Sequence, residues 1–125
     1  YLVLASYWTV AEESLADSKH GMSRASLSHA CEFETSMMLH LHKHLVRLEA
    51  AVGYGESAPP TPSGVRVAGR FNMKSETGAL GSPELATAEK GESLLNAVVA
   101  DVAALVEQMI DWPLRDVLGP VDPSP

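Results

Sequence analysis

The sequence has one cysteine, few aromatic residues and no long apolar run. Cys31 is the single cysteine among 125 residues, which excludes an internal disulfide and fits the reducing cytoplasm where we expect the protein. Aromatic residues make up 6% of the chain, and wholly apolar stretches such as residues 97–100 are far shorter than the ~20 residues that cross a bilayer. With 46% hydrophobic and 20% charged residues, the composition is that of a folded soluble protein.

Positive charge is also scarce. Nine Lys and Arg face sixteen Asp and Glu, giving a net charge of −7 with neutral histidines. From Glu84 to Asp122 there are eight acidic and two basic residues, a net charge of −6. Because such a surface repels phosphate groups, we expect neither a nucleic-acid partner nor binding to an anionic membrane.

Three apolar segments are typical of strands. Residues 1–8 lack the alternation of a half-exposed strand, which favours a strand buried on both faces. Short apolar stretches at 46–50 and 65–71 predict two more strands. Since a buried parallel strand needs neighbours at both edges, we expect the functional unit to include polypeptide beyond these 125 residues.

Two segments predict helices. Apolar residues recur at spacings of three, four and seven over residues 29–46, and a longer stripe covers 83–111, with Ser82 as a natural N-cap and proline in the first turn. Glycines and prolines make 53–64 a loop, and 112–125 reads as a surface tail. This order of strands and helices predicts an α/β fold with helices packed on a mostly parallel sheet.

The densest group of reactive side chains lies where a loop enters the first of these helices. The imidazole of His29 and the carboxylates of Glu32 and Glu34 surround a helix start, whose free N–H groups and positive partial charge suit an anion or a developing oxyanion. The same residue types also cap helices. The residues alone therefore leave a catalytic and a capping interpretation open.

Two other groups are weaker candidates. On a helix, His40 and His44 share a face and His42 points elsewhere, so at most two of them could bind one ion, and a solvated face is the simpler interpretation. Cys31 has no adjacent Lys or Arg and has two nearby carboxylates that disfavour a thiolate, which argues against a nucleophile.

Residues 29–36, His-Ala-Cys-Glu-Phe-Glu-Thr-Ser, resemble the His-Ala-Gly-x-x-Glu-Thr-Ser signature of the creatininase (creatinine amidohydrolase) family. Residues 81–91, Gly-Ser-Pro-Glu-Leu-Ala-Thr-Ala-Glu-Lys-Gly, are similar to the family's Gly-x-Pro-x-x-Ala-x-x-Glu-Lys-Gly. The two motifs occur in the family's order. The resemblance spans nearly the whole chain and covers the C-terminal half of a typical member.

The resemblance implies a three-layer α/β/α fold, a hexameric homo-oligomer and metal-dependent hydrolysis of an amide or related C–N bond. In the family, two divalent metals are held largely by an N-terminal Glu-x-His and a following Asp, and a metal-bound water attacks the carbonyl. That N-terminal motif is not among these residues. The resemblance thus places the ligands for zinc, manganese or iron mainly on an N-terminal half or a second chain.

Four residues receive roles from the resemblance. His29 matches the family's acid/base histidine, and Glu34 matches the signature glutamate, which we expect to orient His29 or the helix start and which alone here could contact the metal. Cys31 replaces the signature glycine, which narrows the space beside the reacting centre, and we expect it to contact the substrate there. Trp8, at the end of the first predicted strand, either lines the substrate pocket or is a large core side chain.

One departure bears on the substrate. A Trp-Asp pair that precedes the histidine in creatininases is Ala25-Ser26 here, which argues against creatinine itself. The leading hypothesis is a hydrolase of a small-molecule or peptide amide. The alternatives are a noncatalytic binding or assembly subunit with the same fold, and a peptidase or tailoring hydrolase of a biosynthetic pathway.

Overall fold

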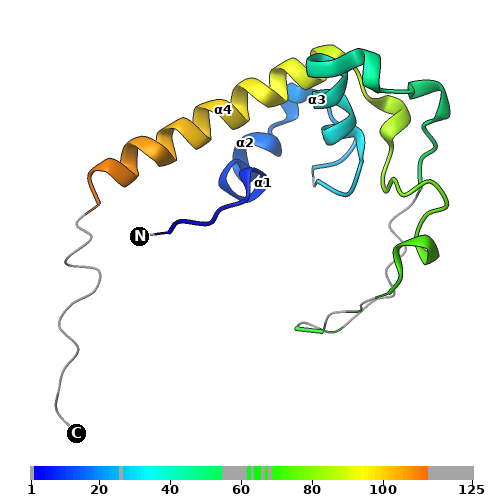
Figure 1. The fold of residues 1–125 in the computed structure, drawn as a ribbon, viewed down its shortest axis with the longest axis horizontal. Helices are drawn as coiled ribbons and strands as arrows, with labels where there is room; N and C mark the ends of the chain where they lie inside the picture. The colour runs from blue at the N-terminus through cyan, green and yellow to red at the C-terminus, as the bar shows by residue number, and fades with distance from the viewer. Residues whose placement is uncertain are drawn as a thin grey trace, which may run out of the picture.

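Helices dominate the computed structural model, which describes residues 2–25, 27–54, 62, 64–65, 67 and 69–112. Figure 1 shows the longest helix, α4, running along the molecule, with α1 and α2 beside it and α3 crossing its N-terminal half. In chain order the elements are α1 (Tyr7–Val10), α2 (Glu12–Leu15), η1 (Ser18–His20), α3 (Glu32–His42), η2 (Lys43–Leu45), η3 (Leu48–Ala50), η4 (Phe71–Met73), η5 (Pro83–Leu85) and α4 (Ala88–Ile110).

The predicted three-layer α/β/α fold with a mostly parallel sheet is wrong. Across the described ranges there is no strand, and the one extended pairing is an isolated antiparallel bridge between Tyr54 and Gly81. Its two backbone hydrogen bonds measure 2.9 and 2.8 Å. Helices therefore pack on one another here and not on a sheet.

Each predicted strand fails for a local reason. Residues 2–6 are not helical but pair with no strand in the described part, Leu2 and Leu4 are 95% and 94% exposed, and Tyr7 already begins α1. A short apolar run alone does not distinguish a strand from a helix. The 46–50 stretch falls within 3-10 turns and their connection, and the described positions of 65–71 form no strand before the turn at Phe71. Most of the predicted loop 53–64, and the tail from 113, lie outside the described residues.

The two predicted helices exist with shifted boundaries. Cys31 is the extended N-cap of α3, so the helix begins at Glu32 and not at residue 29. Ser82 makes no capping hydrogen bond and is followed by the single turn η5. Thr87 caps α4 instead, its Oγ1 accepting from the backbone N–H of Lys90 at 3.2 Å.

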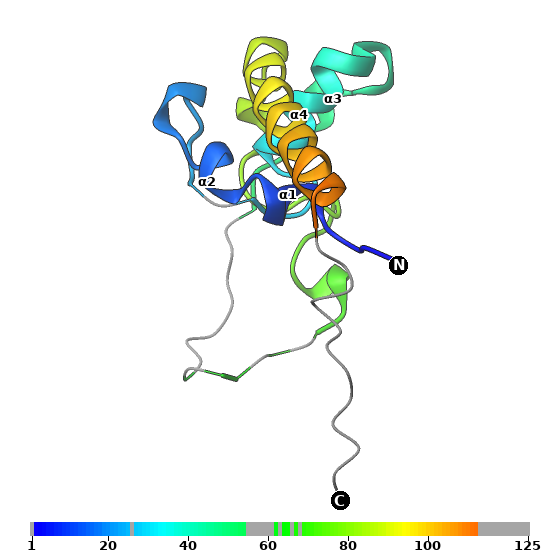
Figure 2. The ribbon, with the colours of Figure 1, turned by 90° about the vertical axis from the view of Figure 1, so that its left-hand side faces the viewer.

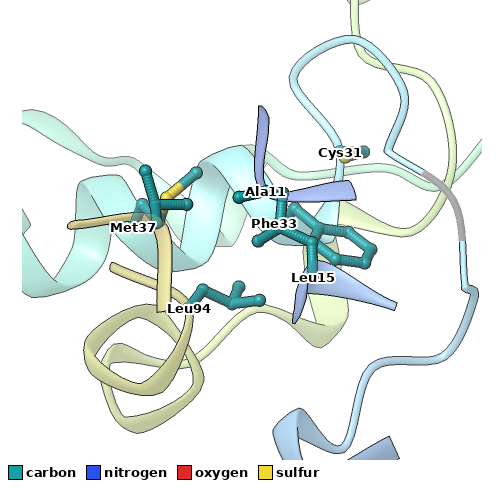
Figure 3. Packing of buried hydrophobic residues seen from close by; sticks show 7 residues of the cluster. Ala11, Leu15, Cys31, Phe33, Met37 and Leu94 are labelled. Atoms are coloured by element: carbon teal, nitrogen blue, oxygen red, sulfur yellow. The ribbon is translucent and has the colours of Figure 1, made fainter. Parts of the chain in front are cut away.

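The core forms where α1, α2 and α3 meet α4. Phe33 and Leu94 are its largest fully buried apolar side chains. Figure 3 shows them packed with side chains from the preceding helices, and Figure 2 shows α2 and α3 on opposite sides of α4. The buried cluster consists of Ala11, Leu15, Cys31, Phe33, Met37, Leu94 and Val98.

The backbones of α3 and α4 approach each other closely at Gly91. A Cβ atom there would lie 1.9 Å from the carbonyl oxygen of Ser36, a distance that no rotation of a side chain can relieve because both groups are backbone. The Ser36 hydroxyl, fully buried, accepts from the backbone N–H of Thr87 at 3.3 Å. Glycine is thus required by the helix crossing.

We expect Gly91→Ala to lower the free energy of unfolding by about 2 kcal/mol. Alanine gains about 1 kcal/mol of helix propensity, but the imposed separation of the helices costs about 3 kcal/mol, so the net effect is destabilising. Urea unfolding followed by circular dichroism measures the change. Gly69→Ala is the matched control, because nothing lies within 4 Å of its added Cβ. A stabilised Gly91→Ala protein would contradict the crossing described above.

Helix α4 is shorter than the predicted helix over 83–111, and it is apolar over most of its length. Its mean hydropathy over an 18-residue span is 1.5, which together with its length would permit it to cross a bilayer, and 11% of that span is buried. Its buried residues are Gly91, Leu94 and Val98, and its second half exposes Val106 and Ile110. The first half of α4 is therefore a core helix of this fold, and the second half presents an apolar surface.

Candidate functional site

The His29 side chain is exposed at the turn that leads into α3 and is held from two sides. Its ring meets that of Phe71 edge to face, with 4.7 Å between centroids and an interplanar angle of 69°. Its backbone carbonyl accepts from the N–H of Leu80 at 2.8 Å. Both partners come from a distant stretch of chain, so the turn is fixed by tertiary contacts.

Ala30, the next residue, has the left-handed φ of 46° that non-glycine residues rarely adopt. Glu34 holds this conformation, because its Oε2 accepts from the Ala30 N–H at 2.5 Å. Thr35 adds a bond from its hydroxyl to the Ala30 carbonyl at 3.3 Å. The Glu34 carboxylate thus orders the helix start beside His29, without a hydrogen bond to the imidazole in the described part of the chain.

Cys31 is buried, with 3% of its surface exposed. Its Sγ accepts weakly from the Ser28 N–H at 3.3 Å, and its Cβ lies 3.3 Å from where a Cβ on Gly81 would stand. Gly81 has a left-handed φ of +80°. A side chain at this position is therefore disfavoured both by the backbone conformation and by the close approach to Cys31. Cys31 therefore packs against the 81 turn, and its predicted contact with substrate remains a prediction.

Trp8 lies on α1 and not at the end of a strand. It is 46% exposed and meets Tyr7 edge to face, with 5.0 Å between ring centroids. It lines a surface pocket of about 320 Å³ together with residues of α2 and with Ala25 and Leu27. Its predicted substrate contact likewise remains a prediction.

Tyr7, also on α1, lines a pocket with residues of α3 and α4. Burial raises the pKa of its phenol, and the nearby Glu34 and Cys31 raise it further. Tyr7 and Glu34 both line this pocket of about 320 Å³, between α1, α3 and α4. The structure thus brings the signature glutamate and a tyrosine from α1 to the same pocket.

A buried ion pair connects the two motifs. Lys90 Nζ lies 2.5 Å from Glu32 Oε1 and also donates to the Leu85 carbonyl at 3.0 Å. Glu32 is 2% exposed, and its other oxygen accepts from the hydroxyl and the backbone N–H of Ser23. Burial opposes its ionisation, but the hydrogen bonds from Lys90 and Ser23 outweigh burial and hold the pKa of Glu32 below its usual range.

This depressed pKa predicts a specific loss of stability in acid. Because the folded pKa lies below the unfolded value of about 4.3, the contribution of Glu32 is complete above that pH and is lost as the pH falls through the folded pKa. Urea midpoints measured between pH 7 and pH 3 should therefore fall more steeply for the natural chain than for Glu32→Gln. The other carboxylates are common to both proteins, so parallel curves would contradict the assignment.

The described residues do not form a metal centre by themselves. No group of three or more His, Cys, Asp or Glu side chains that could hold an ion occurs among them. His40, His42 and His44 are exposed, with the last two rings edge to face at 6.0 Å. Glu34 already uses one oxygen on Ala30. A metal bound at this site would take most of its ligands from elsewhere.

Sequence reasoning did not anticipate the roles of two residues of this region, Lys90 and Phe71. A glutamate at position 32, on the same helix face as Ser36 and Leu39, signals a buried polar residue that needs a partner, and Lys90 is that partner. Phe71, by contrast, reaches His29 from a separate loop, and no local pattern indicates that contact.

Comparison with known proteins gives one result. A family model described as creatininase, creatinine amidohydrolase, matches residues 2–106. Neither the curated proteins nor the solved structures yield a significant match.

Proposed function

Because the chain belongs to the creatininase family, we propose that it supplies the acid/base side of an amidohydrolase active site. Membership implies a metal-dependent amidohydrolase. The bond to be cleaved is the C–N bond of a small-molecule or peptide amide. His29 is the group we assign to proton transfer.

The observation that supports this role is the setting of His29. Among the described residues, no hydrogen bond engages either nitrogen of its ring, while its backbone carbonyl and its ring face are held by Leu80 and Phe71. An imidazole that is fixed in position but has free nitrogens can take a proton from water and give one to a leaving nitrogen. Glu34 acts indirectly, by holding the Ala30 turn.

We assign the metal ligands to polypeptide outside the described residues, since these offer no three-ligand group. The partner proposed is an N-terminal half or a second chain of the same kind of protein, within a homo-oligomer. The exposed apolar residues on the second half of α4, Val99, Val106 and Ile110, provide surface for such an assembly.

The test is to purify the chain from its native source under non-denaturing conditions. Mass spectrometry then identifies bound polypeptides, elemental analysis measures zinc, manganese and iron, and a panel of amides is assayed for hydrolysis. A complex that holds metal and releases amine supports the proposal. A homogeneous, metal-free 13.3 kDa species without amidase activity would contradict the proposed function.

The second candidate is a noncatalytic assembly subunit. It is favoured by the same apolar surface of α4 and by the lack of a ligand group in the described part. A stable complex in which His29→Ala leaves all turnover unchanged would support this alternative over the first.

A further inference from the structure

A groove lies between the short helices α1 and α2 and the second half of α4, with a volume of about 530 Å³. Val10 and Leu105 contribute half-buried apolar side chains to it. Three carboxylates also line it, Glu12 and Glu13 from α2 and Asp101 from α4, and its lining contains no Lys, Arg or His. The groove therefore combines apolar surface with negative charge.

The residues of α4 that line the groove follow one another at spacings of three and four, so they share one face of the helix. They are Asp101, Ala104, Leu105 and Gln108. At about 3.6 residues per turn, the exposed apolar residues of the second half lie on roughly the opposite face. These are Val99, Val106 and Ile110. The groove is thus a surface separate from the apolar one described above.

The opposite charge lies where α3 ends. Residues 38–47, which we call the basic end of α3, contain Lys43, Arg47, three histidines and no acidic residue. Leu41 and Leu45 are 50% and 64% exposed there. Arg47 is exposed and forms no ion pair in the described part of the chain. The basic end of α3 therefore matches the groove in both respects, since it offers positive charge and unburied leucines.

One chain does not bring these two surfaces together. The groove follows the second half of α4, whereas α3 crosses the first half (Figure 1). Helices α2 and α3 also lie on opposite sides of α4 (Figure 2). Two copies can join the surfaces in a head-to-tail arrangement, while the pairing of two grooves or of two basic ends places like charges opposite each other and is disfavoured.

We propose that the basic end of α3 of one copy docks into the groove of a second copy. Leu41 and Leu45 supply the apolar contact, and Lys43 and Arg47 face the carboxylates of the groove. Because the two surfaces differ, the contact is heterologous and repeats until the copies close a ring or form a chain. The inference extends the homo-oligomer of the proposed function by naming its contacting surfaces, and it does not depend on catalysis.

Sedimentation equilibrium of the full chain tests the contact. We expect an average mass that rises reversibly with concentration beyond that of a dimer, because each head-to-tail step leaves one groove and one basic end unused. Raising NaCl from about 0.1 M to about 1 M shortens the Debye length from about 10 Å to about 3 Å. The Kd of association should then rise about tenfold, since the ion pairs lie at the surface.

Charge reversal identifies the two surfaces. Lys43→Glu with Arg47→Glu reverses the basic end, and Glu12→Lys with Glu13→Lys reverses the groove. Each double variant should raise the Kd at least about 100-fold, because like charges then face each other. An equal mixture of the two should associate again, since each variant offers the other an opposite charge at both contacts. Misfolded variants are not rescued by mixing.

Arg70→Glu with Lys74→Glu is the matched control, because it makes the same charge change at two exposed residues outside both surfaces. This variant should associate like the natural chain. Asp101→Lys replaces the groove variant if α2 does not form. A natural chain that stays monomeric, a control that loses association equally, or a mixture that stays monomeric would overturn the inference.

The outcome is separable from that of the proposed function. Self-association without amidase activity leaves the contact and removes the amidohydrolase. Turnover that depends on His29 in a preparation without self-association does the reverse.

Discussion

Replacing Lys90 with methionine is expected to destabilise the folded chain by about 3 kcal/mol. The change leaves the Glu32 carboxylate buried with only Ser23 as a partner, and removing one member of a buried pair typically costs about 3–5 kcal/mol. The lower end applies because the Lys90 side chain is 24% exposed, which lets water reach the site. Urea unfolding at pH 7 measures the loss.

The design of the control follows from a second ion pair. Lys19 and Asp17 lie 3.0 Å apart with side chains 60% and 41% exposed, so Lys19→Met should leave the unfolding midpoint unchanged. Adding Glu32→Gln to Lys90→Met removes the unpaired charge and should recover part of the loss, giving a coupling of about 1–3 kcal/mol. If the two substitutions are additive, the pair does not act as a unit.

We expect His29→Ala to reduce turnover by the assembled enzyme by about 10²- to 10⁴-fold, the usual contribution of a positioned acid/base group. The loss should fall on kcat more than on KM, because the imidazole is assigned to proton transfer in the transition state and not to substrate binding. Since the side chain is exposed, the free energy of unfolding should change by less than about 0.5 kcal/mol. Steady-state kinetics and thermal unfolding test the two statements separately.

His40→Ala is the matched control, because His40 is also exposed but lies on the far half of α3. Its turnover should equal that of the natural chain. Phe71→Leu removes the ring that packs on His29 and should produce an intermediate loss, while Phe71→Tyr retains the ring contact and should restore turnover. Equal turnover in His29→Ala and His40→Ala would exclude His29 from the mechanism.

Periodicity predicted the helices of this fold but not its class. The stripes of apolar residues that identified α3 and α4 arise from burial on one face, which both helices retain. The apolar run at 1–8 has no helical period. The start of α1 at Tyr7 accompanies the packing of that side chain against the core, which the run itself does not indicate. The first residue of α4 depends on one capping side chain. Thr87 caps the helix, although Ser82, which precedes a proline, matches the sequence pattern of an N-cap.

The local half of the candidate site was accessible from the sequence. The bond between Glu34 and the Ala30 N–H spans four residues and is local to the helix start, where the sequence predicted one. The ring contact of His29 with Phe71, the ion pair of Glu32 with Lys90 and the pocket shared by Glu34 and Tyr7 all join distant parts of the chain. No pattern within one segment specifies such pairs, because they depend on how the helices pack.

The left-handed conformation of Ala30 gives the start of α3 a stability cost that a glycine would avoid. A non-glycine residue in this region costs on the order of 1 kcal/mol, which the fold tolerates next to the residue assigned to proton transfer. Ala30→Gly should thus yield a more stable chain whose turn samples more conformations. Selection for activity would act against that gain, so position 30 is a point where thermal tolerance and catalytic precision oppose each other.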